Sequence, residues 1–403
     1  MGRLGASGIL HSELGRRLAP GWLKSAIKSA IPYAEFRSEQ CRREAEELLG
    51  GPMSPQSDYA SPYPFSIGII TDTSYYFAHH VRACREMCVA YRLVDISPSN
   101  WIELVRESGC DAFLASPSTL LSSLRHMFDE RLRVIAEDMK KLLFPSYSEL
   151  WLWESKRRMR DWLVAHGIPH PKSDVFYNRD ESLAFVDAAD YPLVCKTDTS
   201  AAANGVFVLR DKRAARRMAR EAFARGILPR EWDRRDRQRG NILFQAFVPH
   251  DHEWRIVRIG DDYLCRRKVR VGDFASGSGG IEWAKPTEEM LSFVEEVTNR
   301  GGFTSMGVDF FVVSHGGSRE MFLVNELQCL VGEIVNEQNR NEHTGKWRRS
   351  SGNWEFEPGF FYQNACANLR VALVVNELLR NRGSTSSPRV VVPPASSSPG
   401  SQP

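Results

Sequence analysis

The sequence predicts an α+β protein with a small α/β layer near its beginning. Two observations predict this class. Residues 65–115 alternate short apolar strands with helical stretches, which is typical of a parallel sheet. Residues 241–327 contain strands paired across tight turns, which is typical of antiparallel hairpins.

Composition narrows the class of protein. The length of 403 residues suffices for two or three domains, and the net charge of +3 argues against a nucleic-acid partner. The eight cysteines are scattered, which argues against a zinc site or a disulfide framework and indicates a cytoplasmic protein. No apolar run approaches the ~20 residues needed to cross a bilayer.

Residues 1–64 are expected to be a helical extension followed by a linker. Amphipathic patterns predict helices over 21–30 and 35–49, and residues 50–64 are rich in Pro, Gly and Ser. The first helix is basic and carries Trp22, so it can lie on a membrane surface, although such helices more often pack on their own protein.

Residues 65–145 are expected to form the parallel α/β layer. The predicted elements, in order, are strand 65–70, helix 76–91, strand 92–96, helix 101–107 and strand 112–115. The segment has no G-x-G-x-x-G turn, so an NAD site is not expected.

The stretch after this layer begins with a helix signal. Ser146 and Glu149 have the spacing of a capping box, and the apolar periodicity continues to His166 before Gly167 and a proline. Lys156 lies within this helix. On its own, such a lysine is most often solvated.

Residues 191–209 predict a strand, a loop of small residues and a second strand. The first strand ends in Lys196, and the second begins at Gly205. Small residues let backbone N–H groups approach a phosphate, and a lysine adds a positive charge. The Walker pattern G-x-x-x-x-G-K-[ST] is absent from the sequence, and strand–loop–strand fits a hairpin that covers phosphates as a lid.

The next segment is rich in charge. Residues 212–225 predict an Arg-rich helix, and the mixed-charge run 230–239 is typical of a solvated loop. Strand 241–248 follows, and then a hairpin of residues 253–260 and 263–271. Alternation along its second strand places Arg266, Lys268 and Arg270 on one face and Arg267 on the other.

A second hairpin, of residues 307–313 and 321–327, carries charges in apolar strands. Asp309 interrupts the first strand, Glu326 ends the second, and Gln328 shares the face of Glu326. Buried carboxylates are costly unless paired with a cation, and oxygen donors of this kind suit Mg²⁺. The alternative is that Asp309 is an ordinary core residue with its hydrogen bonds satisfied, and that Glu326 lies at the edge of the sheet.

The remaining elements complete the predicted organisation. Helices are expected over 287–299 and 360–379, and 336–356 is polar and irregular. The Ser/Pro-rich end predicts a disordered tail, 383–403. The main α+β unit is thus 146–382.

Together, these residues resemble the ATP-grasp superfamily. The resemblance spans about 65–379 and rests on Lys156 with the following GIPHP, Lys196 with its loop, strand 241–248, and the Asp309–Glu326 hairpin. The stretch RRKVRVGDFASGSGG is similar to the ribosomal-protein glutamate ligase-like branch. The resemblance implies two α+β subdomains that clasp ATP, preceded by a small Rossmann-like α/β domain.

The resemblance also implies roles for individual residues. It assigns ATP contacts to Lys156, Lys196, Gly205, Gln245, Ala246, Phe247, Val248 and Glu253. The backbone of 245–248 would read adenine, and Glu253 would lie at or near the ribose hydroxyls. It assigns stabilisation of phosphate charge to Arg255 and Arg267, and Mg²⁺ binding to Asp309, Glu326 and Gln328.

Three positions depart from the pattern of the family. Gln328 replaces the usual Asn, three alanines replace glycines before Gly205, and Ala275 replaces the Arg expected after Asp-Phe.

The implied function is an ATP- and Mg²⁺-dependent carboxylate–amine ligase. A small-molecule or peptide carboxylate would be activated as an acyl phosphate and captured by an amine or a similar nucleophile. Two alternatives stay open: a non-catalytic ATP-binding regulatory protein, and a small-molecule kinase on the same fold.

Overall fold

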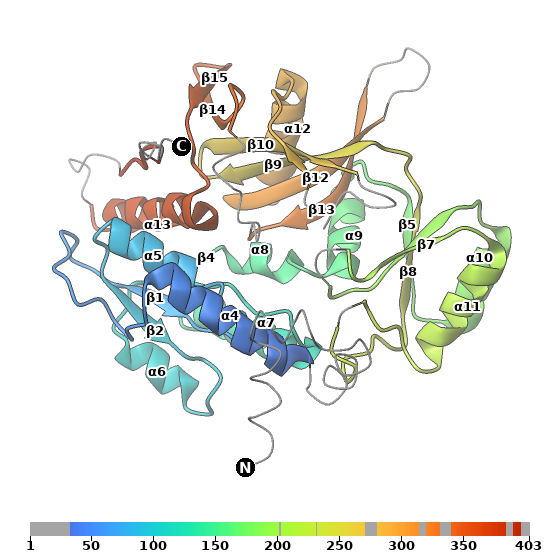
Figure 1. Cartoon of the computed structure of the whole chain (residues 1–403), viewed down its shortest axis with the longest axis horizontal. Helices are drawn as coiled ribbons and strands as arrows, with labels where there is room; N and C mark the ends of the chain where they lie inside the picture. The colour runs from blue at the N-terminus through green and yellow to red at the C-terminus, as the bar shows by residue number, and fades with distance from the viewer. Residues whose placement is uncertain are drawn as a thin grey trace, which may run out of the picture.

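The computed structural model describes most of the chain. The described residues are 33–200, 203–230, 232–270, 280–313, 320–330, 340–383 and 390–395. Within them the chain forms three sheets with helices packed on them, which confirms the α+β class (Figure 1). None of the helices in this described part has the length and apolar character needed to span a bilayer. The predicted basic helix 21–30 lies outside it.

The first sheet is parallel, as the strand–helix alternation predicts. It has four strands in the order β2-β1-β3-β4. The strands are β1 (Ile67–Ile70), β2 (Tyr91–Val94), β3 (Ala112–Leu114) and β4 (Leu142–Phe144), with helices α5 (Ala78–Glu86), α6 (Trp101–Glu107) and α7 (Ser122–Arg133) between them. β1 is buried along its whole length because it lies inside the sheet. The helix expected over 76–91 is shorter, since Tyr91 already belongs to β2.

The segment 50–64, predicted as a linker, packs along the edge of this sheet. Leu93 N–H donates to the Pro55 carbonyl at 2.8 Å, and Ser57 N–H to the Tyr91 carbonyl at 3.0 Å. The Tyr59 hydroxyl donates to the Val89 carbonyl at 2.8 Å. Tyr59 and Tyr63 supply the apolar surface that packs on this layer, although the Pro, Gly and Ser content of the segment predicts a linker. The preceding helix, α4 (Tyr33–Leu49), agrees with the expected 35–49.

A second sheet is small and antiparallel, with the order β5-β8-β6-β7. Its strands are β5 (Ser173–Phe176), β6 (Leu193–Lys196), β7 (Val206–Leu209) and β8 (Ile242–Ala246). Helices α10 (Arg179–Ala188) and α11 (Lys212–Phe223) cover one face, because their buried alanines and valine pack on strand phenylalanines (Figure 1).

The third sheet is the largest, with the path β13-β12-β9-β10-β14-β15 and β11 beside β10. Its strands are β9 (His252–Ile259), β10 (Asp262–Val269), β11 (Ile281–Glu282), β12 (Ser305–Val313), β13 (Met321–Gln328), β14 (Gly345–Ser350) and β15 (Asn353–Pro358). The last two replace part of the irregular segment expected over 336–356, because Trp347 and Trp354 are buried on the sheet.

The two faces of the large sheet are different. One face carries Trp254, Ile256, Val308 and Phe310, which pack with α12 (Glu288–Arg300) in the main core. The other face is apolar at one end, where α13 (Ala367–Asn381) covers Val257 and Leu264. Charged residues occupy the end of that face that α13 does not cover, and they form part of the site described below.

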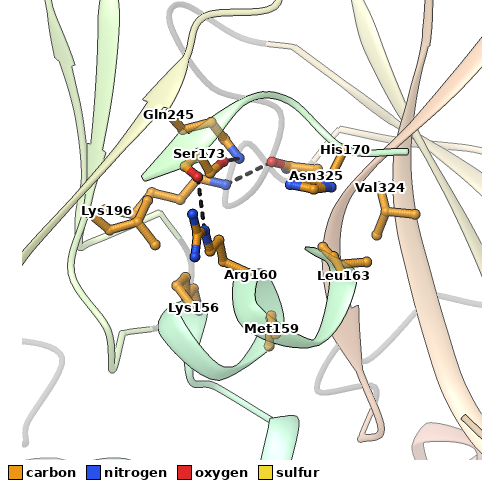
Figure 2. Close-up of a pocket in the computed structure, with 11 residues that line it drawn as sticks. Lys156, Met159, Arg160, Leu163, His170, Ser173, Lys196, Gln245, Val324 and Asn325 are labelled. Carbon is orange, nitrogen blue, oxygen red and sulfur yellow. Dashed lines mark hydrogen bonds between the residues drawn. The ribbon is translucent and has the colours of Figure 1, made fainter. Parts of the chain in front are cut away.

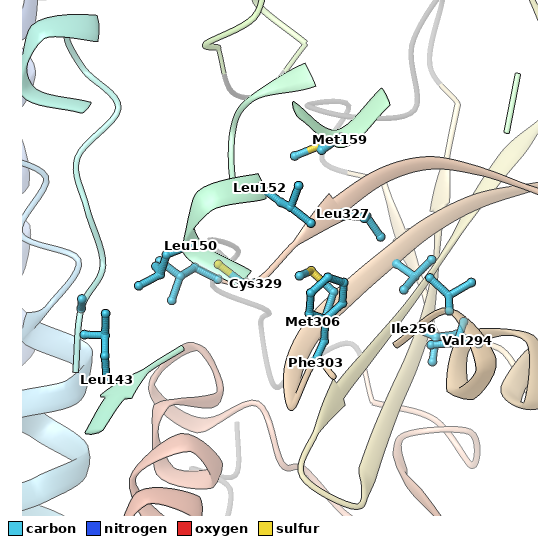
Figure 3. Packing of buried hydrophobic residues seen from close by; sticks show 14 of the residues in the cluster. Leu143, Leu150, Leu152, Met159, Ile256, Val294, Phe303, Met306, Leu327 and Cys329 are labelled. Atoms are coloured by element: carbon cyan, nitrogen blue, oxygen red, sulfur yellow. The ribbon is translucent and has the colours of Figure 1, made fainter. Parts of the chain in front are cut away.

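The main core joins the large sheet to the parallel layer (Figure 3). Leu143 of β4 and Leu150 and Leu152 of α8 (Tyr147–Leu152) belong to the same cluster as Met306 and Leu327. The capping box of Ser146 and Glu149 is present, and the other carboxylate oxygen of Glu149 accepts from Ser305 N–H at 2.6 Å. This capping residue therefore also fixes the helix to β12.

The charge run 230–239 is not the solvated loop that its composition suggests. Trp232 and Asp233 are buried, and Asp233 accepts from Ala34 N–H of α4 at 3.1 Å. Asp236 accepts from Ser122 N–H at the start of α7 at 2.9 Å. The run thus connects the small sheet with helices of the parallel layer.

Residues 390–395 also differ from the expectation of a disordered tail over 383–403, of which 384–389 and 396–403 lie outside the described residues. Val390 exchanges two hydrogen bonds with the Asn376 side chain, at 2.8 and 3.0 Å. Val392 is buried, and Ala395 N–H donates to the Phe360 carbonyl at 3.0 Å. The valines of this stretch, which the Ser/Pro content hides, pack residues 390–395 on the core.

Candidate functional site

A pocket lies where the small sheet meets the edge of the large sheet (Figure 2). Its cavity volume is about 20 Å³, room for about one water molecule, and the hollow opens to solvent. Its lining residues are Lys156, Met159, Arg160, Leu163, His170, Ser173, Lys196, Leu243, Gln245, Val324 and Asn325. The predicted helix to His166 is in fact two helices, and the second one, α9 (Lys156–Ala165), forms one wall.

The break between α8 and α9 places Lys156. Glu154, in the break, has a φ of 53°, an unfavourable value for a residue with a side chain. Lys156 is the first residue of α9 and is only 9% exposed, so it is not the solvated lysine that its position suggests. The ammonium group points into the site instead of into water.

Three oxygen atoms surround the Lys156 ammonium. They are Glu326 Oε1 at 2.8 Å, Glu154 Oε2 at 2.9 Å and the Ser200 carbonyl at 2.9 Å. Burial alone would lower the pKa of Lys156, but the two carboxylates outweigh burial and raise it. Glu326 is therefore not an unpaired buried charge, because Lys156 supplies the cation that the sequence led us to seek in a metal alone.

Asp309 is the most buried carboxylate of the site, with 0% exposure. Arg255 donates to both of its oxygens, at 2.6 Å each, and Lys268 donates to Oδ2 as well. Burial alone would raise the pKa of Asp309, but the charges and hydrogen bonds of Arg255 and Lys268 hold it well below the usual range. Asp309 is therefore ionised at neutral pH.

Strand register places these groups on one face. Asp309 lies opposite Arg255 on β9 and opposite Glu326 on β13, while Gln328 lies opposite Gly307. The predicted metal residues Asp309, Glu326 and Gln328 are thus neighbours on one face of the sheet. In the described part of the chain, no group of three or more His, Cys, Asp or Glu side chains has the arrangement of a metal site. The oxygen donors here are two carboxylates and one amide.

Arg267 is the predicted site residue that the structure does not bring to this face. It lies opposite Trp254, on the side of the sheet that packs with α12, and it pairs with Glu282 at 2.7 Å. The alternation noted in the sequence already separates it from Arg266 and Lys268. Arg267 therefore does not lie with the other predicted residues on this face. The cation of β10 that contacts Asp309 is Lys268.

Lys196 is the second lysine of the pocket. Its ammonium donates to Asn325 Oδ1 at 2.7 Å, and the Asn325 amide donates to Glu253 Oε1 at 3.2 Å. Burial lowers the pKa of Lys196 to about 8, against the opposing effect of Glu326 and Glu253. Glu253 was assigned to the ribose end of the nucleotide, yet it lies among the charges of the large sheet, 3.7 Å from Lys268.

The loop after Lys196 closes tightly on Gly205. A Cβ added to Gly205 would lie 1.8 Å from Thr197 Oγ1 and 2.1 Å from Ser200 Oγ, so a larger residue cannot fit without a shift. Thr197 N–H donates to the Gly205 carbonyl at 2.8 Å, which closes the hairpin. Residues 201–202 of this predicted lid, and 271–279 with Ala275, lie outside the described residues.

The predicted adenine-reading segment starts at the pocket and leaves it. Gln245 lines the pocket and donates to Ser173 Oγ at 3.1 Å. Ala246 ends β8, with its N–H bonded to the Lys172 carbonyl at 2.8 Å. Phe247 and Val248 follow as half-buried residues beyond the strand. Of the four, only Gln245 is among the lining residues.

Among the residues of this site that sequence reasoning missed are Glu154, Lys268 and Asn325. The sequence contains a signal for Lys268, because alternation along its strand places it on the face opposite Arg267. In the folded sheet that is the face on which Asp309 lies. Glu154 and Asn325 had none, because a helix break and a strand irregularity position them.

Comparison with protein families addresses the predicted resemblance. Residues 154–229 match the family model of the phosphoribosylglycinamide synthetase ATP-grasp (A) domain. Over these residues the resemblance to ATP-grasp proteins is confirmed. This matched segment contains Lys156, Lys196, Gly205 and the small-sheet helices α10 and α11. No curated protein matches the chain by sequence.

Several solved structures are similar in shape to part of this chain. One is N5-carboxyaminoimidazole synthetase from Staphylococcus aureus complexed with ADP, with 12% identity, 80% of each chain covered and a TM-score of 0.49. Another is D-alanine–D-alanine ligase from Bacillus anthracis, with 15% identity, 66% of this chain and 88% of that chain covered, and a TM-score of 0.45. A third is a RimK domain ATP-grasp protein from Sphaerobacter thermophilus, with 16% identity, 65% and 90% covered, and a TM-score of 0.44.

Proposed function

We propose that the protein is an ATP-dependent ligase that joins a carboxylate to an amine or a similar nucleophile. The observation that carries this proposal is the pair of buried lysines, Lys156 and Lys196, on two walls of one pocket beside the carboxylates of Asp309 and Glu326. Transfer of a phosphoryl group is catalysed mainly by positioning and by neutralisation of charge, which these residues can supply.

The proposed nucleotide lies with its base in the pocket and its phosphates toward the large sheet. Lys196 and the Thr197–Gly205 loop would hold phosphate oxygens, because buried ammonium and backbone N–H groups favour an anion. Arg160 and Gln245 line the same pocket and can fix the base. The paired charges of Arg255, Lys268 and Asp309 keep the neighbouring face rigid.

The residues present fit Mg²⁺ if Lys156 releases Glu326. Asp309, Glu326 and Gln328 offer the hard oxygen donors that this ion prefers, and they lie on one sheet face. A bound Mg²⁺ would neutralise charge on the phosphates. Lys156 keeps Glu154 and the Ser200 carbonyl as partners when Glu326 turns away, so the exchange does not strand a buried ammonium.

The proposed reaction activates the carboxylate of a small molecule or peptide. The carboxylate oxygen attacks the γ-phosphorus, which forms an acyl phosphate and releases ADP. The nucleophile then attacks the acyl carbon and releases phosphate. Two alternatives make different products: a kinase keeps the phosphate on its product, and a regulatory protein binds ATP without turnover.

Nucleotide binding is tested by calorimetric titration with a non-hydrolysable ATP analogue and Mg²⁺. The parent is expected to bind, and Lys196→Met is expected to weaken binding by about 1.5–3 kcal/mol, the range for hydrogen bonds to charged groups. Lys212→Met, on the exposed start of α11, is the matched control and should bind as the parent does. No heat at millimolar ligand would overturn the nucleotide site.

The reaction class is tested by a screen of carboxylates with ATP, Mg²⁺ and hydroxylamine. A ligase that forms an acyl phosphate should give a hydroxamate together with one ADP and one phosphate. A phosphorylated product without free phosphate would identify a kinase. Nucleotide binding without any turnover across the screen would favour the regulatory alternative.

A further inference from the structure

An irregularity in β13 brings Asn325 into the pocket. The register pairs Asp309 with Glu326 and then Phe310 with Val324, so Asn325 is an extra residue without an opposite on β12. In a regular strand, Asn325 and Glu326 would point to opposite faces. A bulge removes that constraint, because it bends the strand and re-aims a side chain. Figure 2 shows Asn325 in the pocket, facing Lys196.

Both ends of the Asn325 amide are used, and they connect two sheets. The oxygen accepts from Lys196 Nζ of the small sheet at 2.7 Å. The nitrogen donates to Glu253 Oε1 of the large sheet at 3.2 Å. Lys196 is 8% exposed and Glu253 is 2% exposed, so both hydrogen bonds are screened little by water.

The two pocket lysines therefore have different electrostatic environments. Lys156 pairs with two carboxylates, Glu154 and Glu326. Lys196 instead donates to a neutral amide, which fixes the ammonium without cancelling its charge. An ammonium has three N–H donors, and among the described residues one hydrogen bond of Lys196 Nζ, to Asn325, leaves two N–H groups to point elsewhere.

We propose that Asn325 is a positioning residue of the nucleotide site, which aims the charged Lys196 ammonium at a phosphate group. This inference rests on the nucleotide site proposed above. The long stem of lysine has many rotamers, and holding one of them in the free protein removes an entropic cost from binding. An aspartate at this place would neutralise Lys196 and repel Glu253, whereas an amide satisfies both neighbours.

The test is a double-mutant cycle of Asn325→Ala and Lys196→Met, with affinity for Mg²⁺ and ADP measured by calorimetry. Asn325→Ala alone should weaken binding about tenfold, the lower part of the range for a hydrogen bond to a charged group. In the Lys196→Met background the same change should have little further effect, because Asn325 acts through Lys196. A merely structural role would weaken binding equally in both backgrounds.

Asn376→Ala is the matched control, because both ends of that amide are also hydrogen-bonded, to Val390, away from the pocket. It should bind ADP as the parent does. Thermal melts establish that each variant is folded, and Asn325→Ser, too short to reach Lys196, replaces the alanine variant in the cycle if alanine does not fold.

Two outcomes would overturn this inference. One is unchanged affinity in the Asn325 variant, and the other is an equal loss in both backgrounds. Failure of the parent itself to bind ADP would overturn the proposed function instead.

Discussion

Glu253 is a residue of the site whose ionisation depends strongly on its surroundings. Burial raises the pKa of Glu253 to about 7, although the nearby Lys268 charge opposes this and the Asp309 and Glu326 charges reinforce it. Because this folded-state pKa lies above the usual value of about 4.5, the contribution of Glu253 to stability is fully present below pH 4.5. That contribution is lost as the pH rises through about 7.

We therefore expect Glu253→Gln to remove part of the pH dependence of stability. Relative to this variant, the parent should lose about 1–3 kcal/mol of unfolding free energy between pH 4.5 and pH 8. Urea unfolding of both proteins across this range is the measurement. Parallel curves would show that Glu253 titrates in the folded protein as it does in the unfolded chain.

A substitution of Glu326 tests the proposed exchange of its partner, from the Lys156 ammonium to Mg²⁺. Glu326→Gln keeps the shape but takes one of two carboxylates from Lys156, so the ligand-free protein should lose about 1 kcal/mol of stability. Phosphoryl transfer should fall by orders of magnitude, because the proposed metal site would lose a charged ligand. Glu355→Gln on exposed β15 is the control. Retained turnover would contradict the metal assignment.

At the scale of elements, the terminal segment makes a clear prediction. Deleting residues 396–403 should leave the melting temperature unchanged, whereas deleting 390–403 should lower it by a few degrees. The reason is that Val392 is buried and Val390 bonds twice to Asn376. Equal melting temperatures for both truncations would show that the docked segment contributes no stability.

At the scale of the whole molecule, Asp236 joins the small sheet to the parallel layer. Its carboxylate accepts from Ser122 N–H at the first turn of α7 and from Trp232 Nε1 at 3.1 Å. Asp236→Ala leaves that helix end without its partner and should cost about 1–2 kcal/mol of unfolding free energy. Asp138→Ala, at an exposed position, is the control.

Hydrogen exchange gives the location of the effect. Loss of the Asp236 contact should speed exchange at the start of α7, since the cap is what satisfies the Ser122 amide. Unchanged exchange there, together with a normal melt, would mean that other contacts hold the small sheet on this layer.

Much of the fold follows from patterns within single segments. The capping box at Ser146, the hairpin of β12 and β13, and the shared face of Glu326 and Gln328 were all predictable. These features depend on periods of 2 and 3.6 residues and on capping chemistry, which neighbouring residues impose on each other. The resemblance to ATP-grasp proteins rested on the order of such segments.

Features that depend on distant contacts were not predictable. The docked segments 50–64 and 390–395 read as linker and tail, because their few tyrosines and valines become informative only beside the surface that they cover. The charge run 230–239 read as solvated for the same reason, although its aspartates accept from helix starts elsewhere in the chain.

The sequence by itself determined which residues carry charge into apolar strands and on which face they lie. Only the tertiary structure decided their partners. Lys196 and Asn325 are 129 positions apart, and a one-residue bulge turns Asn325 toward that lysine. Lys156 meets Glu326 only because a break before α9 turns it inward. Alternation is a local property of the backbone, whereas the pairing of buried charges depends on which surfaces the fold brings together.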